Sequence, residues 1–170
     1  FANSIGGTRK ITAVAINSDG TLGASGGDRG NVVLFELSGS TVKATPLESL
    51  PDTGVSADFS PTANLLVFVT DRGFVQTYNP ANKARLTGER SGLSRAYCGA
   101  ISPDGGYLAI GGNSGEVALM SLPGLIAVGS RVKVPGNDNV QRVAFSPDSK
   151  LVVAGSIGNG VAHWAVNNFN

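Results

Sequence analysis

The chain contains one histidine, His163, and one cysteine, Cys98. Protein zinc sites take several His, Cys or carboxylate ligands, and the chain has neither a second histidine nor a cysteine cluster. As a general base, His163 would need a nucleophile within hydrogen-bond reach, so we interpret it as a strand side chain beside Trp164. Cys98 is interpreted as a small packing residue, with a reactive thiol as the alternative. We therefore predict no catalytic residue, no metal site and no cofactor.

Two glycine-rich strings are superficially similar to phosphate-binding loops. They read G-G-D-R-G (26–30) and G-G-N-S-G (111–115). Neither has the Lys-Ser/Thr ending of a P-loop, and no helix is expected to follow. Asp or Asn followed two residues later by Gly favours a tight hairpin turn, because glycine accepts positive φ without strain. We therefore interpret both strings as turns.

The composition limits the class of protein. The 170 residues include 24 glycines, and the formal net charge is +1. Such a small charge provides no bulk attraction to nucleic acid or acidic membranes. No apolar run approaches the roughly 18 residues needed to cross a bilayer. With 41% hydrophobic residues, the chain is expected to be folded and turn-rich, without nucleic acid as a partner and without membrane insertion.

One unit of 27 residues occurs four times. The copies align without a gap over 11–37, 54–80, 96–122 and 140–166. The unit recurs every 42 to 44 residues, measured at the start of its first turn, at Asn17, Ser60, Ser102 and Ser146. Each copy holds three short apolar stretches separated by two turns. Stretches of five to seven residues, rich in Val, Leu, Ile and Phe and bounded by Gly or Pro, are typical of strands.

Equivalent positions of the copies carry similar apolar residues. The third strand has a column of valines, Val32, Val75, Val117 and Val161. Three residues further on is a column of large side chains, Phe35, Tyr78, Met120 and Trp164. Strands that are apolar on both faces predict small sheets packed face to face. Asp58 interrupts a column of alanines, and we expect it to make a structural hydrogen bond or ion pair, with a ligand contact in a channel as the alternative.

The connections between copies are long enough for a fourth strand. They span 38–53, 81–95 and 123–139, and each includes a more polar segment able to form an outer strand. The residues beyond the two ends of the repeats, taken together, nearly match one connection in length. We therefore predict an all-β fold of four-stranded antiparallel sheets, with residues 1–10 as the outer strand of the last one.

With these repeats, the sequence resembles the WD-repeat β-propeller family. The matching motifs are F-S-P-D at 145–148, I-S-P-D-G at 101–105 and L-A-I-G-G at 108–112. Family repeats of about 40 to 45 residues form four-stranded blades. The resemblance implies one propeller module over 1–170, with repeats at 11–53, 54–95, 96–139 and 140–170.

The repeats depart from the family pattern in their polar residues. No Trp-Asp dipeptide occurs and no Gly-His pair precedes a first strand, so the family's His–Ser/Asp–Trp hydrogen-bond network cannot form in full. We expect apolar packing to replace it, since burying one Val, Leu or Phe contributes about 1.5–3 kcal/mol. The expected structural residues are Asp28, Asp71, Asn113, Phe35, Tyr78 and Trp164.

The blade number leaves three alternatives. Family rings usually have seven blades, so the chain is expected to be a segment or half of a larger propeller, or half of an eight-bladed ring made by two copies, or a closed four-bladed ring. In the second case each N-terminal strand completes the other copy's last blade. An open arc would expose apolar blade faces, which monomers rarely tolerate. We therefore expect a homodimer, or the remaining blades, as partners.

The resemblance also implies which charged residues share a surface. Family first strands begin at one face, called the top, and the second turns lie there too. The top is expected to bind an acidic or mixed-charge protein segment, because arginine pairs bidentately with carboxylates and is enriched at interface hot spots. Ordinary solvated turns are the alternative. The predicted partner-binding residues are Lys10, Arg29, Arg72, Arg95 and Arg142, with Arg9 beside them, and the opposite face receives Asp19, Asp104 and Asp148.

We accordingly expect a non-enzymatic scaffold for protein–protein interaction. One alternative is an enzymatic propeller of the lactonase type, which needs His, Arg and carboxylates converging at a channel mouth. Another is an engineered or excised fragment that self-assembles, favoured by Phe1 as first residue. The single cysteine, with no basic-then-apolar N-terminal segment, favours the cytoplasm or nucleus over secretion.

Overall fold

The computed structural model describes residues 10–158 and 160–169, which form antiparallel sheets. We number the sheets 1 to 4 along the chain. Sheet 1 contains β1 (Ile11–Ile16), β2 (Leu22–Gly27), β3 (Val32–Ser38) and β4 (Thr41–Pro46). Sheet 2 contains β5 (Gly54–Phe59), β6 (Leu66–Thr70), β7 (Phe74–Tyr78) and β8 (Arg85–Arg90).

The second half of the chain repeats this order. Sheet 3 contains β9 (Ala96–Ile101), β10 (Tyr107–Gly112), β11 (Glu116–Ser121) and β12 (Ile126–Ala127), with β13 (Val132–Lys133) also paired to β11. The described strands of sheet 4 are β14 (Val140–Phe145), β15 (Leu151–Ser156) and β16 (Val161–Ala165). Three 3-10 turns are η1 (Asp28–Gly30), η2 (Asn113–Gly115) and η3 (Val166–Asn168). The predicted all-β fold of four antiparallel sheets is confirmed.

The predicted outer strand of sheet 4 falls almost entirely on residues 1–9, which lie outside the described part of the chain. Lys10, the described residue of that segment, directly precedes β1. Its carbonyl accepts a hydrogen bond from the Asp28 N–H at 3.0 Å, so Lys10 belongs to sheet 1. The contribution of residues 1–9 to the last sheet stays a prediction.

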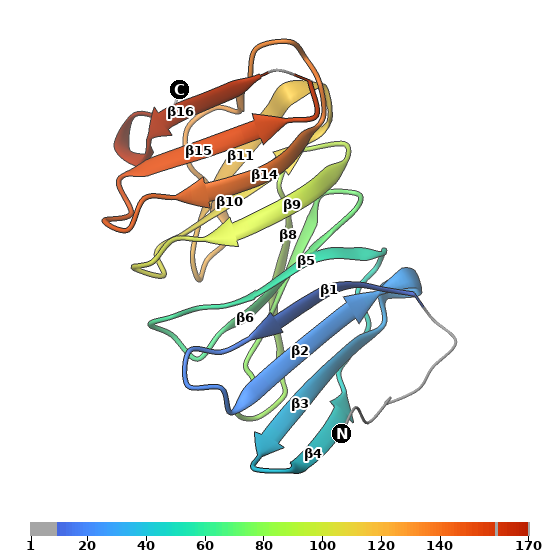
Figure 1. The fold of residues 1–170 in the computed structure, drawn as a ribbon. Coiled ribbons are helices and arrows are strands. Elements are labelled where there is room, and N and C mark those ends of the chain that lie inside the picture. The colour runs from blue at the N-terminus through green and yellow to red at the C-terminus, as the bar shows by residue number, and fades with distance from the viewer. Residues whose placement is uncertain (1–9, 159, 170) are drawn as a thin grey trace.

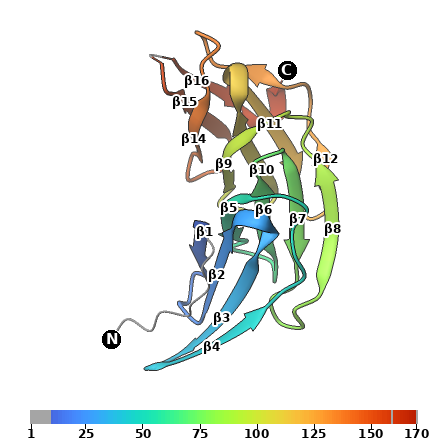
Figure 2. The same cartoon turned by 90° about the vertical axis from the view of Figure 1, so that its right-hand side faces the viewer.

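The sheets follow one another along an open arc (Figure 1). Along its inner side, β1 lies next to β5, β5 next to β9, and β9 next to β14. The strands β8 and β12 lie on the outer side (Figure 2). Sheets 1 and 4 are at opposite ends, so the described residues do not close into a four-bladed ring.

Apolar side chains fill the space between successive sheets. We call the face of a sheet turned toward the next sheet its forward face, and the opposite one its backward face. Leu34 on the forward face of sheet 1 packs with Phe68 and Tyr78 on the backward face of sheet 2. The two aromatic rings meet edge-on, with centroids 6.0 Å apart, a favoured geometry for aromatic pairs. The first interface is therefore a close-packed aromatic and aliphatic layer.

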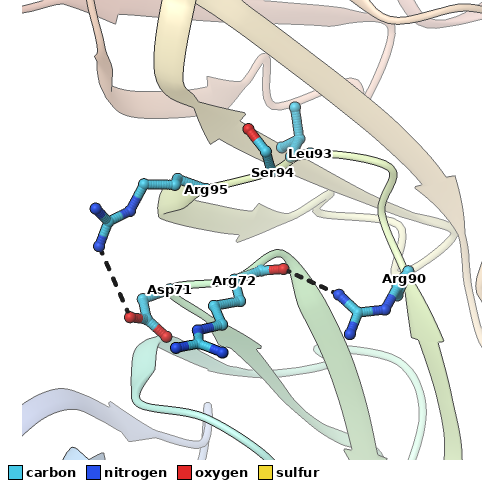
Figure 3. Close-up of a pocket in the computed structure, with 6 residues that line it drawn as sticks. All are labelled: Asp71, Arg72, Arg90, Leu93, Ser94 and Arg95. Atoms are coloured by element: carbon cyan, nitrogen blue, oxygen red, sulfur yellow. Dashed lines mark hydrogen bonds and ion pairs between the residues drawn. The ribbon is translucent and has the colours of Figure 1, made fainter.

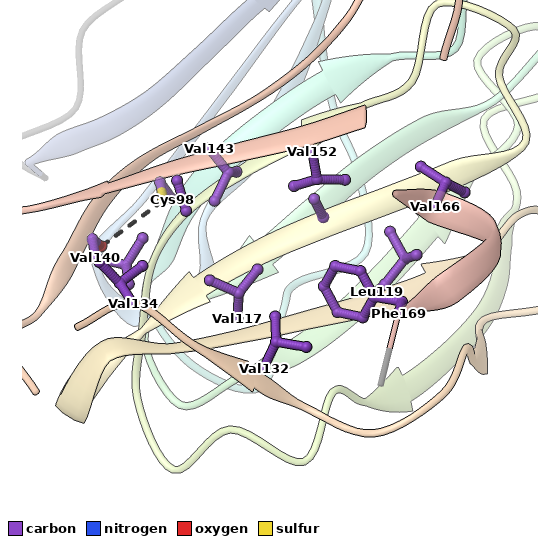
Figure 4. Packing of buried hydrophobic residues seen from close by; sticks show 12 residues of the cluster. Cys98, Val117, Leu119, Val132, Val134, Val140, Val143, Val152, Val166 and Phe169 are labelled. Atoms are coloured by element: carbon purple, nitrogen blue, oxygen red, sulfur yellow. Dashed lines mark hydrogen bonds between the residues drawn. The ribbon is translucent and has the colours of Figure 1, made fainter. Parts of the chain in front are cut away.

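Sheets 3 and 4 enclose a similar layer (Figure 4). Val117 and Leu119 of β11 point toward Val143 of β14 and Val152 of β15. Phe169, which follows η3, closes the layer near the end of the chain. Each sheet thus buries apolar residues against its neighbour, as the alternating columns predict.

The valine column shows how far this packing extends. Val32, Val75 and Val117 are at most 1% exposed, each on a forward face covered by the following sheet. Val161, at the equivalent position of sheet 4, is 71% exposed. The sequence pattern is the same in all four, so the difference comes from the sheet that follows.

Glycine is required in the second turn of the first three sheets. Gly30, Gly73 and Gly115 have φ of +71°, +69° and +74°, in the region that favours glycine. A Cβ atom would also collide with a backbone carbonyl of the connection that follows the third strand. These three glycines are therefore required by the repeated tight turns.

Hydrogen bonds tie the sheets together as well. The Ser56 hydroxyl donates to the Gly99 carbonyl at 3.1 Å, between sheets 2 and 3. On the face opposite the top, which we call the bottom face, the Thr62 hydroxyl donates to the Asp104 carbonyl, and the Asp104 N–H donates to the Ser149 hydroxyl, both at 3.0 Å. First turns of three successive sheets are thereby linked in a chain.

Asp58 makes the structural hydrogen bond expected of it. It lies half-buried in β5, and its Oδ2 atom accepts a hydrogen bond from the Ile101 N–H of β9 at 3.2 Å. Burial raises the pKa of the Asp58 carboxyl above its ordinary value, although the backbone hydrogen bonds from Ile101 and Phe59 oppose this. The carboxylate thus joins sheets 2 and 3 at some cost in desolvation.

Replacing Phe68 by alanine is expected to lower the free energy of unfolding by about 3–5 kcal/mol, because it empties the centre of the first interface. Urea unfolding followed by circular dichroism measures the change. Ile126→Ala is the control, since Ile126 is 68% exposed on an outer strand and should cost at most about 0.5 kcal/mol. Equal losses in the two variants would contradict a core located between the sheets.

The Asp58 carboxyl gives a pH-dependent prediction. Because its pKa is higher in the folded than in the unfolded chain, the folded state binds the proton more tightly. Its stabilising contribution is full below the unfolded pKa and is lost as pH rises through the folded pKa. The free energy of unfolding should therefore rise, relative to that of Asp58→Asn, as pH falls from 7 toward 4.

Urea titrations of the two proteins at several pH values test this difference. The asparagine side chain keeps an acceptor for the Ile101 N–H, so the folded geometry is preserved. Asp19, Asp104 and Asp148 have lowered pKa values and act in the opposite sense, but they are present in both proteins and cancel. If the difference in free energy of unfolding between the two proteins does not change with pH, or changes with the opposite sign, the pKa of Asp58 is not raised in the folded state.

Candidate partner-binding surface

Backbone hydrogen bonds define the top face. In each sheet the first residue after the second strand donates its N–H to the carbonyl of the residue before the first strand. The pairs are Asp28 with Lys10 (3.0 Å), Asp71 with Thr53 (2.8 Å), Asn113 with Arg95 (3.3 Å) and Ile157 with Asn139 (3.0 Å). The starts of the first strands and the second turns therefore lie at the same edge of every sheet, as the family resemblance implies.

A pocket of about 500 Å³ opens on this face between sheets 2 and 3 (Figure 3). Three arginines and one aspartate contribute its charges, which leaves an excess of positive charge. Its lining residues are Asp71, Arg72, Arg90, Leu93, Ser94 and Arg95. Of the five predicted partner-binding residues, the structure thus brings Arg72 and Arg95 together at one pocket.

The arginines are held by weak contacts on the surface. Arg95 Nη2 lies 4.0 Å from Asp71 Oδ2, and Arg72 Nε lies 3.5 Å from Asp52 Oδ1. The Arg72 and Arg95 side chains are 71% and 62% exposed. Exposed ion pairs of this kind contribute only about 0–1 kcal/mol. Both guanidinium groups can therefore exchange their present partners for a carboxylate of a bound segment.

Arg90 is the pocket residue that sequence reasoning missed. It ends the outer strand β8, and its Nη1 donates to the Arg72 carbonyl at 3.5 Å. The signal was present in the sequence: an outer strand directly before a first strand must return the chain to the top. Only the pairing of β8 with β7 shows that Arg90 lies opposite Phe74, beside the second turn.

The other predicted basic residues lie apart from the pocket. Lys10 and Arg29 belong to sheet 1, where Arg29 is exposed in η1. Arg142 lies in β14 on the forward face of sheet 4, and its Nη1 donates to the Gln141 carbonyl at 2.7 Å. The five residues therefore do not form one continuous site.

The turn residues carried over from the family pattern have unequal surroundings. Asn113 Oδ1 accepts hydrogen bonds from the Ser94 hydroxyl at 3.0 Å and from the Arg95 N–H at 3.2 Å, so Asn113 fixes one side of the pocket. In contrast, the buried Oδ1 atoms of Asp28 and Asp71 have no hydrogen-bond partner among the described residues. The two aspartates thus occupy the family positions without its complete network.

The large side chains near the ends of the third strands also differ in their contacts and burial. The Tyr78 hydroxyl donates to the Glu48 carbonyl at 2.6 Å, and burial raises the pKa of Tyr78 to about 12. Trp164 packs edge-on against Phe169, with ring centroids 6.0 Å apart. Phe35 is only half-buried, on the backward face of sheet 1. Tyr78 thus helps to hold the connection between sheets 1 and 2 in place.

The two residues with potential chemistry of their own, Cys98 and His163, do not line the pocket. Cys98 is buried between sheets 3 and 4, and burial raises the pKa of its thiol, which lowers the thiolate fraction. His163 lies in β16, opposite Val153 on the exposed forward face of sheet 4. Within residues 10–158 and 160–169, no three His, Cys, Asp or Glu side chains gather where they could hold a metal ion.

For the described part of the chain, no helix has the length and apolar character needed to cross a membrane. Among known proteins, the family described as "WD domain, G-beta repeat" matches residues 129–164, which include the strands β13 to β15 and all of β16 except Ala165. No protein of curated function matches the chain at a significant level. The matched repeat and the four antiparallel sheets are consistent with a β-propeller of the WD-repeat type.

Proposed function

We propose that the chain is a non-enzymatic interaction scaffold that captures an acidic or mixed-charge segment of a partner protein on its top face. WD40 repeats generally serve protein interaction, which supports the class of function. The observation that carries the proposal is the pocket between sheets 2 and 3, with Arg72, Arg90 and Arg95 around it. Guanidinium groups form bidentate, charge-assisted hydrogen bonds with carboxylates, and arginine is enriched at interface hot spots.

The geometry of the pocket favours an extended acidic segment over a single ion. Arg72 and Arg95 come from different sheets, so their guanidinium groups can contact successive carboxylates of one peptide. Leu93 also lines the pocket, but its side chain is buried, so the charged groups provide the main contacts. Asp71 offers an acceptor for a basic or hydroxyl side chain, which suits a segment of mixed charge.

The alternative of a lactonase-type enzyme receives less support. It needs a histidine, arginines and carboxylates that converge on one site. His163 lies on the exposed forward face of sheet 4, whereas the arginine pocket lies between sheets 2 and 3.

The free, buried thiol of Cys98 supports our further proposal that the protein works in a reducing compartment, the cytoplasm or nucleus. We also propose that other propeller sheets cover the two ends of the arc.

The double variant Arg72→Glu/Arg90→Glu is expected to weaken binding of an acidic peptide by at least about 10-fold, since two attractive contacts become repulsive. The probe is a fluorescein-labelled peptide of Asp, Glu and Ser, titrated with the chain and followed by fluorescence anisotropy. Wild-type affinity should fall as salt is raised, because exposed charges are screened.

Two matched variants make this test specific. Lys150→Glu reverses a charge that is 80% exposed next to a first turn, on the bottom face, and should leave affinity unchanged. Arg29→Glu, in the top turn of sheet 1, should have a smaller effect than the double variant. The proposal fails if the wild-type chain does not bind the peptide at low salt, or if Lys150→Glu weakens binding as much as the double variant.

A further inference from the structure

The two ends of the arc expose sheet faces that are buried everywhere else in the molecule. On the forward face of sheet 4, Val161 is 71% exposed, whereas the equivalent Val75 of sheet 2 is completely buried. On the backward face of sheet 1, Val14 is 72% exposed, whereas the equivalent Val143 of sheet 4 is 8% exposed. At both ends of the arc, therefore, positions that are buried between sheets elsewhere in the chain have no sheet packed against them.

These two exposed faces are of opposite kinds. The chain already packs a forward face against a backward face three times, between sheets 1 and 2, 2 and 3, and 3 and 4. The free face of sheet 4 is a forward face, and the free face of sheet 1 is a backward face. One copy of the chain therefore carries both halves of a fourth interface of the same type.

We propose that a second copy of this chain covers both ends, so that sheet 4 of each copy packs against sheet 1 of the other. The dimer proposal rests on the proposal above that other propeller sheets cover the two ends of the arc. It does not depend on the proposed binding of an acidic segment at the top face. A two-fold axis produces both contacts at once, because residue i meets residue j and residue j meets residue i. The product is a closed eight-bladed ring, within the range of four to eight blades typical of propellers.

Side-chain size supports this pairing. Between sheets 2 and 3, Val69 of β6 faces Gly99 of β9, where an added Cβ would lie 3.0 Å from Val69 Cγ2. The equivalent positions at the two ends are Gly155 of β15 and Val14 of β1, so the large and small residues are exchanged. The space around Gly155 is open, which leaves room for a valine from the other copy.

A polar contact can also be repeated at the ends. Between sheets 2 and 3 the Ser56 hydroxyl donates to the Gly99 carbonyl. Arg142 occupies the position of Ser56 in sheet 4, and Val14 occupies that of Gly99 in sheet 1. The Arg142 guanidinium would then donate to the carbonyl of Val14 in the other copy, which gives this residue a role in assembly.

Sedimentation equilibrium of the whole chain tests the proposal. The expected result is a discrete species of twice the 17.2 kDa chain mass. Val14→Asp and Val161→Asp should each raise the dimer dissociation constant by at least about 100-fold, because each places an unpaired carboxylate in both interfaces of the dimer. Circular dichroism checks folding, which should persist because both side chains are exposed in the single chain.

Mixing the two variants provides the sharpest outcome. In a mixed dimer, sheet 1 of the Val14→Asp chain meets sheet 4 of the Val161→Asp chain, so both carboxylates fall in one interface and the other interface is unchanged. Mixing should therefore recover part of the association that either variant alone has lost. Ile126→Asp is the matched control on an outer strand and should dimerise like the wild type.

Three results would overturn the proposal. They are a wild-type chain that stays monomeric at every concentration, oligomers that grow without limit, and a dimer that both variants leave unchanged. A monomer that still binds the acidic peptide would leave the top-face function intact. Conversely, a dimer that does not bind the peptide would refute that function alone.

Discussion

The face-to-face packing of one sheet against the next is the interaction on which the rest of the molecule depends. Each sheet is small and apolar on both faces, so it needs a neighbouring sheet to bury those faces from water. Leu34, Phe68 and Tyr78 form the first layer, and two further layers repeat it. Because each sheet contacts only its neighbours, stability is close to a sum of nearest-neighbour interfaces, as in other repeat proteins.

This packing explains why the chain tolerates an incomplete polar network. Asp28 and Asp71 each keep a buried oxygen without a hydrogen-bond partner in the described residues, which costs free energy. Buried Val, Leu and aromatic side chains in three layers offset that cost. Some polar contacts still hold a connection in place. One example is the hydrogen bond that the Tyr78 hydroxyl donates to the Glu48 carbonyl. The result is a scaffold whose strands carry the stability and whose turns are free to carry charge.

The top face follows from that division. The second turns need glycine at positions such as Gly73 and a few backbone hydrogen bonds, but no particular side chain in between. Arg72 occupies such a free position, with its guanidinium in solvent. The family resemblance was enough to place Arg72 and Arg95 at the same edge of their sheets. It could not show that Arg90 joins them, because that depends on where β8 ends against β7.

The repeat, the strands, the tight turns and the residues that face each sheet interface follow from the amino-acid pattern alone, because all of these depend on local φ preferences and on the period-2 alternation of side chains. Which of those faces are covered depends instead on how the sheets pack in three dimensions. Val75 and Val161 have the same residue type and the same place in the repeat, yet one is buried and the other is 71% exposed. Burial is a property of the neighbouring sheet, which no residue in a strand encodes by its own type.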